Sequence, residues 1–310
     1  MLLILLVSCK YKDLYYEQDD WAEVTVGFDW QHTPKLEPEG MTVLFYREQL
    51  GSTTPERYNY PGKQGGKARL RPGEWKAVGY NYDTETILYQ GMESAATLEA
   101  YTRNSTISEG TRMPTRDMPR AQTTEDQPVI LEPDPLCGGA SSTFPLVLNQ
   151  SQTVTVTPHM RTKEVVINIT NVPNLQYCTD YGGALSGLAP SVLVTSGILG
   201  EGCVTEAFAG RAIDAATLEF KFRIFGHCPE SEQGILNPHL LTIYIILADG
   251  SKWYYVVDVS NQMHGSGHGS EGEKIDIEVS GLPVPKPIVN GSGFQPTIDS
   301  WQGVEINVDM

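Results

Sequence analysis

The sequence lacks the short motifs by which many enzymes and cofactor-binding proteins are identified. It contains no Gly-x-Ser-x-Gly elbow, no phosphate-binding Gly-Lys loop, no dinucleotide fingerprint and no His-Glu-x-x-His pair. Its acidic residues also lack the dense Asp, Asn and Gly spacing of a calcium loop. We therefore predict that the protein is not an enzyme and that it has no cofactor and no metal.

Basic residues are scarce. The chain has 22 Lys and Arg against 38 Asp and Glu, which gives a net charge of −16. An acidic chain is repelled by phosphate backbones and by anionic lipid surfaces, so nucleic acid is excluded as a partner. The 310 residues are 40% hydrophobic, which is enough for real cores and for two domains of ordinary size.

Cysteines are few, and none has the close spacing of a zinc site. One of the five, Cys9, lies at the end of an apolar run and is treated separately below. The other four could form two disulfides with three possible connectivities, or they could be thiols, and the sequence leaves both possibilities open. They are Cys137, Cys178, Cys203 and Cys228.

No apolar run is long enough to span a bilayer, which takes about 20 residues. The first run, Leu2–Val7, has the size of a signal-peptide core and leads into Ser8 and Cys9, an ending that resembles a bacterial lipobox. Residues 1–9 are therefore predicted to be a lipoprotein signal peptide ending at the lipidated Cys9, with 10–20 as a spacer. No Lys or Arg precedes the run, so the true start codon stays open. The alternative is a buried N-terminal strand with Cys9 in the core.

Long segments with a 3.6-residue period are also absent. At most, helical turns are expected near 180–194 or 204–209. Apolar residues instead alternate with period two in many short segments, which is typical of half-buried strands. In the first such segment, Val24, Val26, Phe28 and Trp30 are predicted to lie on one face. The sequence predicts an all-β chain with two sandwich-like domains, 21–150 and 151–310.

Turn signals predict two hairpins. The first joins 67–70 to 75–81 through Pro72-Gly73, and the second joins 240–247 to 252–259 through Asp249-Gly250. By contrast, prolines interrupt the polar stretch 102–127, so it is expected to be a mobile loop. This stretch carries Arg112, Arg116 and Arg120.

Three features could carry chemistry, and each has a simpler interpretation. Cys228 follows His227, but neighbouring residues of an extended chain point to opposite faces, which disfavours a Cys–His nucleophile. His264 and His268 flank a glycine-rich segment, for which a solvated loop is preferred to a metal site. The 15 tyrosines and five tryptophans could stack on sugars, but most are expected in cores and cross-strand pairs.

Several stretches taken together resemble the fimbrillin-related surface lipoproteins of Bacteroides-type bacteria, similar to the FimB-like and Mfa-like minor fimbrial subunits. The resemblance covers essentially all of the chain after the lipobox, and its most specific part is the proline-rich segment near the C-terminus. The stretches are the lipobox, 26–30, 39–46, 225–229, 247–251 and 282–294.

The resemblance implies two transthyretin-like β-sandwich domains and assembly by β-strand complementation, in which one subunit adds a strand to its neighbour. Shaft subunits of the family are cleaved after an N-terminal strand, whereas the arginines here lie in mid-domain, which favours an anchor or accessory subunit. The strand-exchange candidates are Val304, Ile306 and Val308, which lie on one face of the last strand. An ordinary last strand is the alternative.

The sequence thus predicts a lipid-anchored, non-enzymatic fimbrial accessory or adhesion protein at the cell surface of the outer membrane. Its expected partners are fimbrial subunits or other surface proteins, together with the membrane through the N-terminal lipid. One rival is a glycan-binding outer-membrane lipoprotein of a nutrient-capture system, which would need exposed aromatic side chains on one face. A surface hydrolase is the other, and it would need paired carboxylates or a Cys–His contact in a cleft.

Overall fold

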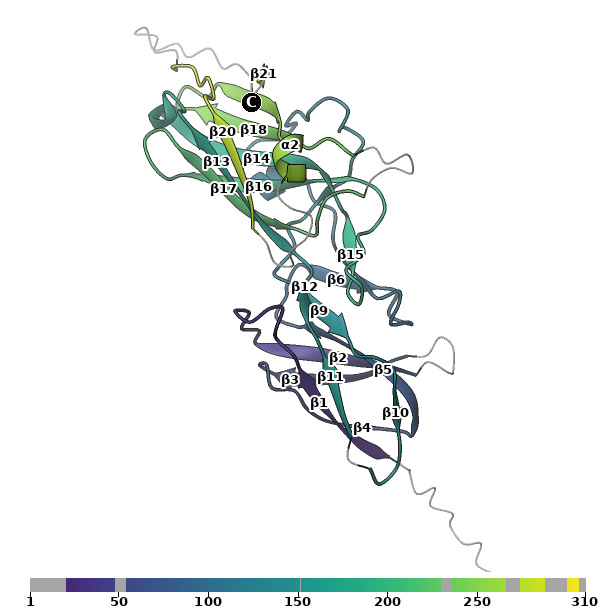
Figure 1. The fold of residues 1–310 in the computed structure, drawn as a ribbon. Helices are drawn as coiled ribbons and strands as arrows, with labels where there is room; N and C mark the ends of the chain where they lie inside the picture. Colours follow the sequence, from purple (N-terminus) through teal and green to yellow (C-terminus); the bar gives the residue numbers. More distant parts are fainter. Residues whose placement is uncertain are drawn as a thin grey trace, which may run out of the picture.

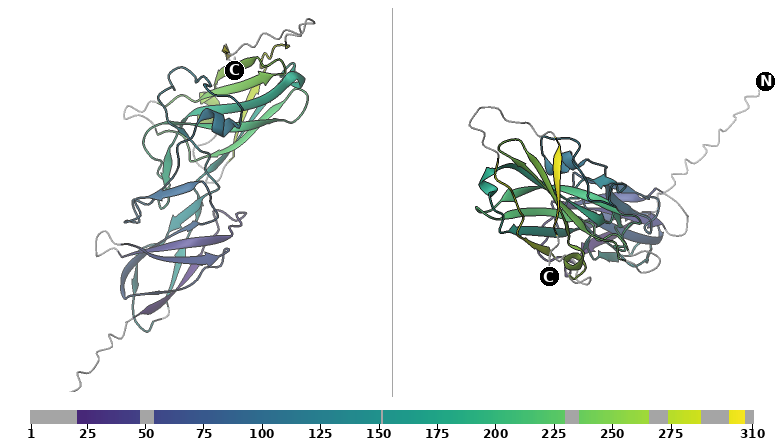
Figure 2. Two further views of the ribbon diagram at one scale, coloured as in Figure 1. Left: turned by 180° about the vertical axis from the view of Figure 1, so that it is seen from behind. Right: turned by 90° about the horizontal axis from the view of Figure 1, so that it is seen from above.

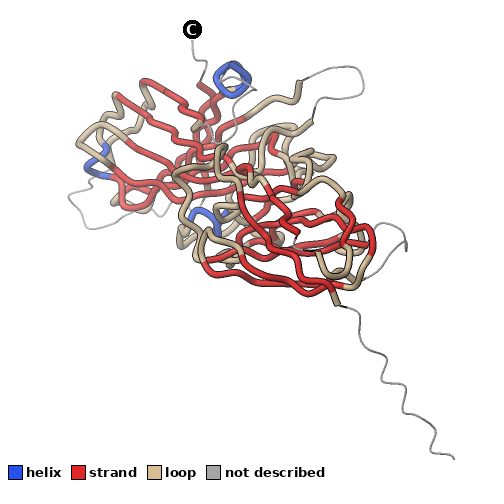
Figure 3. The backbone as a smooth tube through the Cα atoms, turned by 60° about the horizontal axis from the view of Figure 1, so that its bottom comes forward, coloured by secondary structure: helices blue, strands red, loops and turns tan. Residues whose placement is uncertain are grey.

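The computed structural model describes residues 21–47, 54–150, 152–229, 236–265, 274–287 and 300–306. Strands make up most of the regular structure in this part of the chain (Figure 3). The α-helices among these residues are two short ones, α1 (Ile107–Thr111) and α2 (Ser260–Gly265). The predicted all-β fold is confirmed, whereas the finer transthyretin-like, two-domain description stays a prediction.

A first sandwich forms where a three-stranded sheet packs on a six-stranded one. The smaller sheet has the order β11 (Gln152–Val156), β1 (Ala22–Phe28), β4 (Gly66–Leu70). The larger sheet has the order β12 (His159–Met160), β9 (Cys137–Ala140), β5 (Gly73–Asn81), β2 (Gly40–Arg47), β3 (Glu56–Pro61), with β10 (Phe144–Leu146) also on β5. Val24 and Val26, predicted to share a face, are both buried in the core between the sheets.

The predicted hairpin at Pro72-Gly73 is wrong. β4 pairs with β1, and β5 pairs with β2 and β9, so the turn carries the chain from one sheet to the facing sheet. Leu70 and Trp75, on either side of the turn, both enter the core between the sheets. The local sequence specifies a turn. Because the apolar side chains of both strands are buried in the core between the two sheets, the strands face each other across that core and do not pair side by side.

One nine-stranded sheet forms the second sandwich by enclosing its own core. Strands from both of its ends contribute side chains to one apolar cluster. The order is β20 (Ile275–Ser280), β13 (Lys163–Thr170), β17 (Leu218–Ile224), β16 (Val204–Ala212), β14 (Cys178–Leu188), β18 (Leu240–Leu247), β19 (Lys252–Asp258), β21 (Trp301–Ile306), with β8 (Val129–Ile130) on β16.

The Asp249-Gly250 hairpin is confirmed, since β18 and β19 pair antiparallel on either side of it. Gly250 has a φ of +81°, a conformation that glycine adopts without steric cost. The helical turns expected near 180–194 and 204–209 are wrong, because β14 and β16 occupy these segments. β14 is rich in small residues for a packing reason: Phe208 lies directly over Gly183, where any side chain would collide with its ring.

Segment 102–127, expected to be a mobile loop, instead packs against the second sandwich. Arg120 donates hydrogen bonds to Thr205 Oγ1 and to the carbonyl oxygen of Glu125, each at 2.8 Å. The segment contains α1, and its apolar residues cover the outer face of the sheet. These contacts involve Ile107, Met113, Met118, Ala184, Ala207 and Tyr244.

A third, small sheet lies between the two sandwiches (Figure 1), in the order β15 (Ser191–Leu193), β7 (Glu99–Thr102), β6 (Ile87–Gln90). An apolar cluster there joins Leu44 and Tyr46 of β2 to Val192 and Phe225 from the second half of the chain. The domain division near residue 150 stays a prediction. The pairing of β11 with β1, and of β12 with β9, would move that boundary to between β12 and β13.

Candidate functional site

The last described strand, β21, forms one edge of the nine-stranded sheet. It pairs parallel with β19 in a register that runs from Lys252 opposite Trp301 to Val257 opposite Ile306. Figures 1 and 2 show it at the end of the second sandwich farthest from the first. Residues 288–299, outside the described part, connect it to the rest of the chain.

The two faces of β21 differ. Val304 and Ile306 lie opposite Tyr255 and Val257, and their half-buried side chains pack against the sandwich core. Glu305, between them, is exposed. From Val304 to Ile306 the strand thus has the alternation predicted from the sequence, with the two apolar residues inward and Glu305 outward.

The side chains of β21 also fit those of the sheet beside it. Gly303 lies opposite Tyr254, whose ring occupies the place that a side chain would take. The Trp301 ring meets the buried Tyr244 edge to face, with 5.5 Å between ring centroids. β21 is therefore a specific complement to this edge, and a strand without these matches would fit less well.

An edge strand is held on one side only. Within the described residues β21 pairs with β19 alone, and none of its side chains is fully buried. Its release would expose the backbone hydrogen-bonding groups of β19, which is a ready template for a strand from another chain.

Two of the four residues predicted to carry function thus lie in β21. These are Val304 and Ile306, which share the face expected from the sequence. Val308 and Cys9 lie outside the described residues, and their predicted roles stay predictions.

The Cys–His nucleophile is excluded because Cys228 forms a disulfide with Cys203 and has no thiol. Of the pairings left open by the sequence, one bridge is present. Cys137 and Cys178 are free thiols, and burial raises their pKa values to about 12 and about 11, respectively. Such thiols are protonated at neutral pH and are poor nucleophiles.

Glu206, in β16 of the second sandwich, has a neighbouring carboxylate in Glu132. Burial, and then the neighbouring charge of Glu132, raise the pKa of Glu206 well above its usual range. Only 1% of Glu206 is exposed, so a substrate has no access to it. Arg223 forms an ion pair with Glu132 at 3.9 Å. Glu206 is inaccessible, and the partly exposed Glu132 is held in an ion pair, so these two carboxylates give no support to a hydrolase.

The platform of exposed aromatics needed by a glycan-binding protein does not form among the described residues. The large aromatic side chains that are well exposed there are Tyr82 and Tyr177. Tyr82 follows β5 of the first sandwich, whereas Tyr177 precedes β14 of the second. Because these two rings belong to different sandwiches, they form no common platform for a sugar, and they do not favour this rival.

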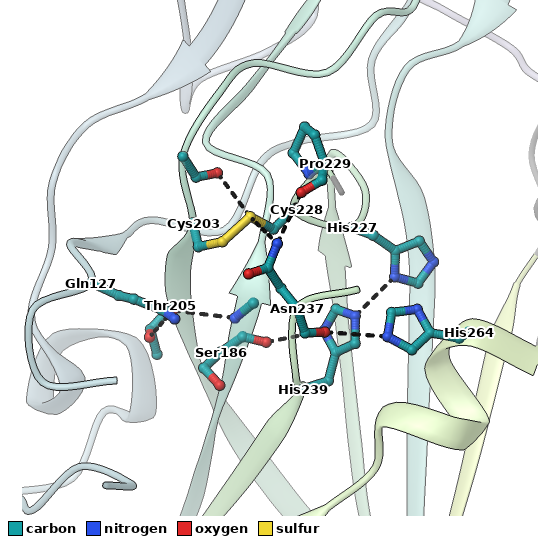
Figure 4. The surroundings of a disulfide bond; sticks show 12 residues. Gln127, Ser186, Cys203, Thr205, His227, Cys228, Pro229, Asn237, His239 and His264 are labelled. Atoms are coloured by element: carbon teal, nitrogen blue, oxygen red, sulfur yellow. Dashed lines mark hydrogen bonds between the residues drawn. A yellow bond between two sulfur atoms is a disulfide. The ribbon is translucent and has the colours of Figure 1, made fainter. Parts of the chain in front are cut away.

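The structure contains a cluster of histidines that the sequence did not predict. His227, His239 and His264 meet beside the disulfide (Figure 4), although 12 and 25 residues separate them along the chain and no motif links them. The expectation that His264 lies in a solvated loop is wrong: it is half-buried on α2, with Nε2 3.2 Å from the carbonyl oxygen of Asn237. His239 is fully buried, and burial lowers its pKa to about 4.

Neither α1 nor α2, nor any other helix in the described ranges, combines the length and the apolar character that a membrane crossing needs.

Comparison with curated proteins gives a partial match. The chain is 35% identical over 104 residues to a Bacteroides ovatus protein with the provisional name of fimbrium anchoring subunit Fim4B. The match covers 33% of this chain and 30% of that protein, so the chain aligns with less than a third of its relative's length. Over this part, the resemblance to fimbrial subunits is confirmed.

Solved structures share the fold along most of the chain. A Bacteroides ovatus protein provisionally called an adhesin superposes with a TM-score of 0.62 at 19% identity, covering 91% of this chain and all of that one. A second Bacteroides ovatus structure with the same provisional description gives a TM-score of 0.50 at 9% identity, covering 84% and 86%. At these identities the likeness establishes the fold alone.

A family model matches residues 8–209, which is most of the chain. It covers the first sandwich and the second as far as β16, and it ends before β21. The chain belongs to this family, which is described as a domain of unknown function, DUF5119.

Proposed function

We propose that this protein is a lipid-anchored anchor or accessory subunit of a cell-surface fimbria, that it is not an enzyme, and that it assembles by β-strand complementation. The observation that carries the proposal is β21, a complementary but half-buried strand on an otherwise open sheet edge. The partial relative named as a fimbrium anchoring subunit and the fold of the adhesin-like structures support the same role.

The exchange would occur at the edge of β19. A strand that replaces β21 would re-form the backbone hydrogen bonds of the parallel ladder and would place two apolar side chains where Val304 and Ile306 now lie. Because the new contacts resemble the old ones, the exchange costs little free energy at equilibrium. The same alternation in the sequence extends the proposed exchange segment to Val308.

Acylation of Cys9 would tether the subunit to the outer membrane. The Cys9→Ala variant removes the sulfur that carries the lipid, so it is expected to remain an uncleaved precursor that takes up no labelled fatty acid. Metabolic labelling followed by immunoprecipitation measures this directly. Normal labelling of the variant would show that the lipid is elsewhere and would remove the tether from the proposal.

Assembly itself can be measured on the native protein. Gently solubilised envelopes are run on a denaturing gel with and without heating, and the chain is detected by antibody. Strand-exchanged assemblies resist detergent until they unfold, so we expect a high-mass ladder that collapses to the monomer on boiling. A single monomer band in the unheated sample would contradict assembly by strand exchange.

A pair of variants assigns the ladder to β21. Val304→Asp/Ile306→Asp gives β21 two carboxylates that cannot enter the apolar core of a neighbouring subunit, so a ladder formed by donation of β21 is expected to disappear. Glu305→Gln changes the exposed residue between them and is expected to preserve it. Equal ladders from both variants would show that the contact lies elsewhere on the molecule.

A further inference from the structure

The cluster of His227, His239 and His264 has the composition of a metal site. Its three imidazoles each offer one nitrogen, and these nitrogens all lie within 4.8 Å of one another. They come from different parts of the second sandwich: the loop after β17, the residue before β18, and α2 (Figure 4). Imidazole is a preferred ligand of zinc and of neighbouring transition metals.

Backbone carbonyls fix the orientation of two of the rings. His239 Nδ1 lies 3.1 Å from the carbonyl oxygen of Ser186, and His264 Nε2 lies 3.2 Å from that of Asn237. A carbonyl oxygen only accepts, so each of these nitrogens carries the hydrogen, and the lone pair is on the other ring nitrogen. Metal-binding histidines are usually held in this way by a second layer of acceptors.

The spacing between two of the ligand atoms also fits a shared ion. His227 Nδ1 and His239 Nε2 are 3.2 Å apart. Two imidazoles on a tetrahedral zinc ion, with bonds of about 2.0–2.1 Å, place their nitrogens about 3.3–3.4 Å apart. A small movement of His264, near the end of α2, would bring the third nitrogen to a similar distance.

The surrounding structure holds the three segments together. The Cys203–Cys228 disulfide anchors the loop next to His227, and Asn237 donates to the carbonyl oxygen of Pro229 at 2.9 Å. The His239 amide donates to Ser260 Oγ at 2.8 Å at the start of α2, which joins the second histidine to the helix of the third. The site is therefore largely formed before any ion arrives.

We propose that His227, His239 and His264 bind one divalent transition-metal ion of the zinc class, with a fourth position left for water or for a ligand from a partner. The ion would clamp α2 against the loop after β17 and so brace one end of the second sandwich, whose core includes Met263 of α2. This proposal does not depend on the fimbrial role of the protein.

The test uses the full-length protein, purified without a histidine tag and treated with chelator. Zinc is titrated by calorimetry, and cobalt(II) is added separately, because a tetrahedral cobalt site absorbs visible light strongly. We expect one equivalent of zinc to bind and cobalt to produce the visible bands. No zinc uptake at micromolar concentrations by the folded protein would overturn the proposal.

Single variants locate the ion. His227→Gln and His264→Gln each remove one ligand from a half-buried position and are expected to weaken zinc binding at least about tenfold. His32→Gln is the matched control, because His32 stacks on His159 in the first sandwich at 4.3 Å between centroids. Circular dichroism checks that each variant is folded. Unchanged affinity in the folded His227 and His264 variants, or an equal loss in the control, would place the ion elsewhere.

Discussion

Replacing both Cys203 and Cys228 with alanine is expected to lower the free energy of unfolding of the second sandwich by about 3.5 kcal/mol. The disulfide closes a loop between residues 25 apart in the sequence, and a loop of this length restricts the unfolded chain by about that amount. The bridge also positions the segment to which Asn237 donates its hydrogen bond, so the native state should lose order locally as well.

Urea unfolding monitored by far-ultraviolet circular dichroism measures this effect, with the wild-type protein kept free of reductant. Cys178→Ala is the matched control: it removes a half-buried free thiol that packs against the same core, and it should cost much less because no cross-link is lost. If the double variant unfolded at the same urea concentration as the wild type, the bridge would contribute nothing to stability.

Local patterns in the sequence predicted individual strands well. Val24 and Val26 are buried on one face as their spacing indicates, and Asp249-Gly250 forms the hairpin that its turn chemistry favours. In both cases the deciding interactions lie within a few residues of one another. Such interactions can be inferred without knowledge of the rest of the fold.

The partners of these strands could not be predicted in the same way. β11 pairs parallel with β1 across more than a hundred residues, and β4 and β5 separate into different sheets. An alternating pattern specifies which side of a strand is buried, but it does not specify which strand lies beside it. The predicted boundary near residue 150 depends on this missing information.

The candidate sites show the same difference between local features, which the sequence predicts, and long-range contacts, which it does not. The alternation of Val304 and Ile306 is visible in the sequence, and β21 has the face expected from it. The histidine cluster is not visible, because tertiary structure alone brings His227, His239 and His264 together. Equally, nothing in the residues around Cys228 indicated that its partner would be Cys203 and not Cys137 or Cys178.

Fixing β21 to its own sheet is expected to abolish assembly completely. In the register of the ladder Val256 lies opposite Glu305, and both side chains are on the face away from the core residues Tyr255 and Val257. Adjacent strands lie about 4.8 Å apart, which suits the geometry of a disulfide. The Val256→Cys/Glu305→Cys variant can therefore be oxidised to lock β21 in place without a change to its inward face.

This disulfide lock between β19 and β21 tests strand exchange most directly, because it prevents β21 from leaving its own sheet whichever partner supplies or receives a strand. The purified double variant, oxidised or mildly reduced, is added to envelopes from cells that lack the protein, and unheated gels are compared. Wild-type protein and Glu305→Cys alone, treated identically, control for the reductant and for the new thiol. Our proposal predicts a monomer when the lock is closed and a heat-sensitive ladder when it is open. A ladder of equal strength from the locked protein would contradict it.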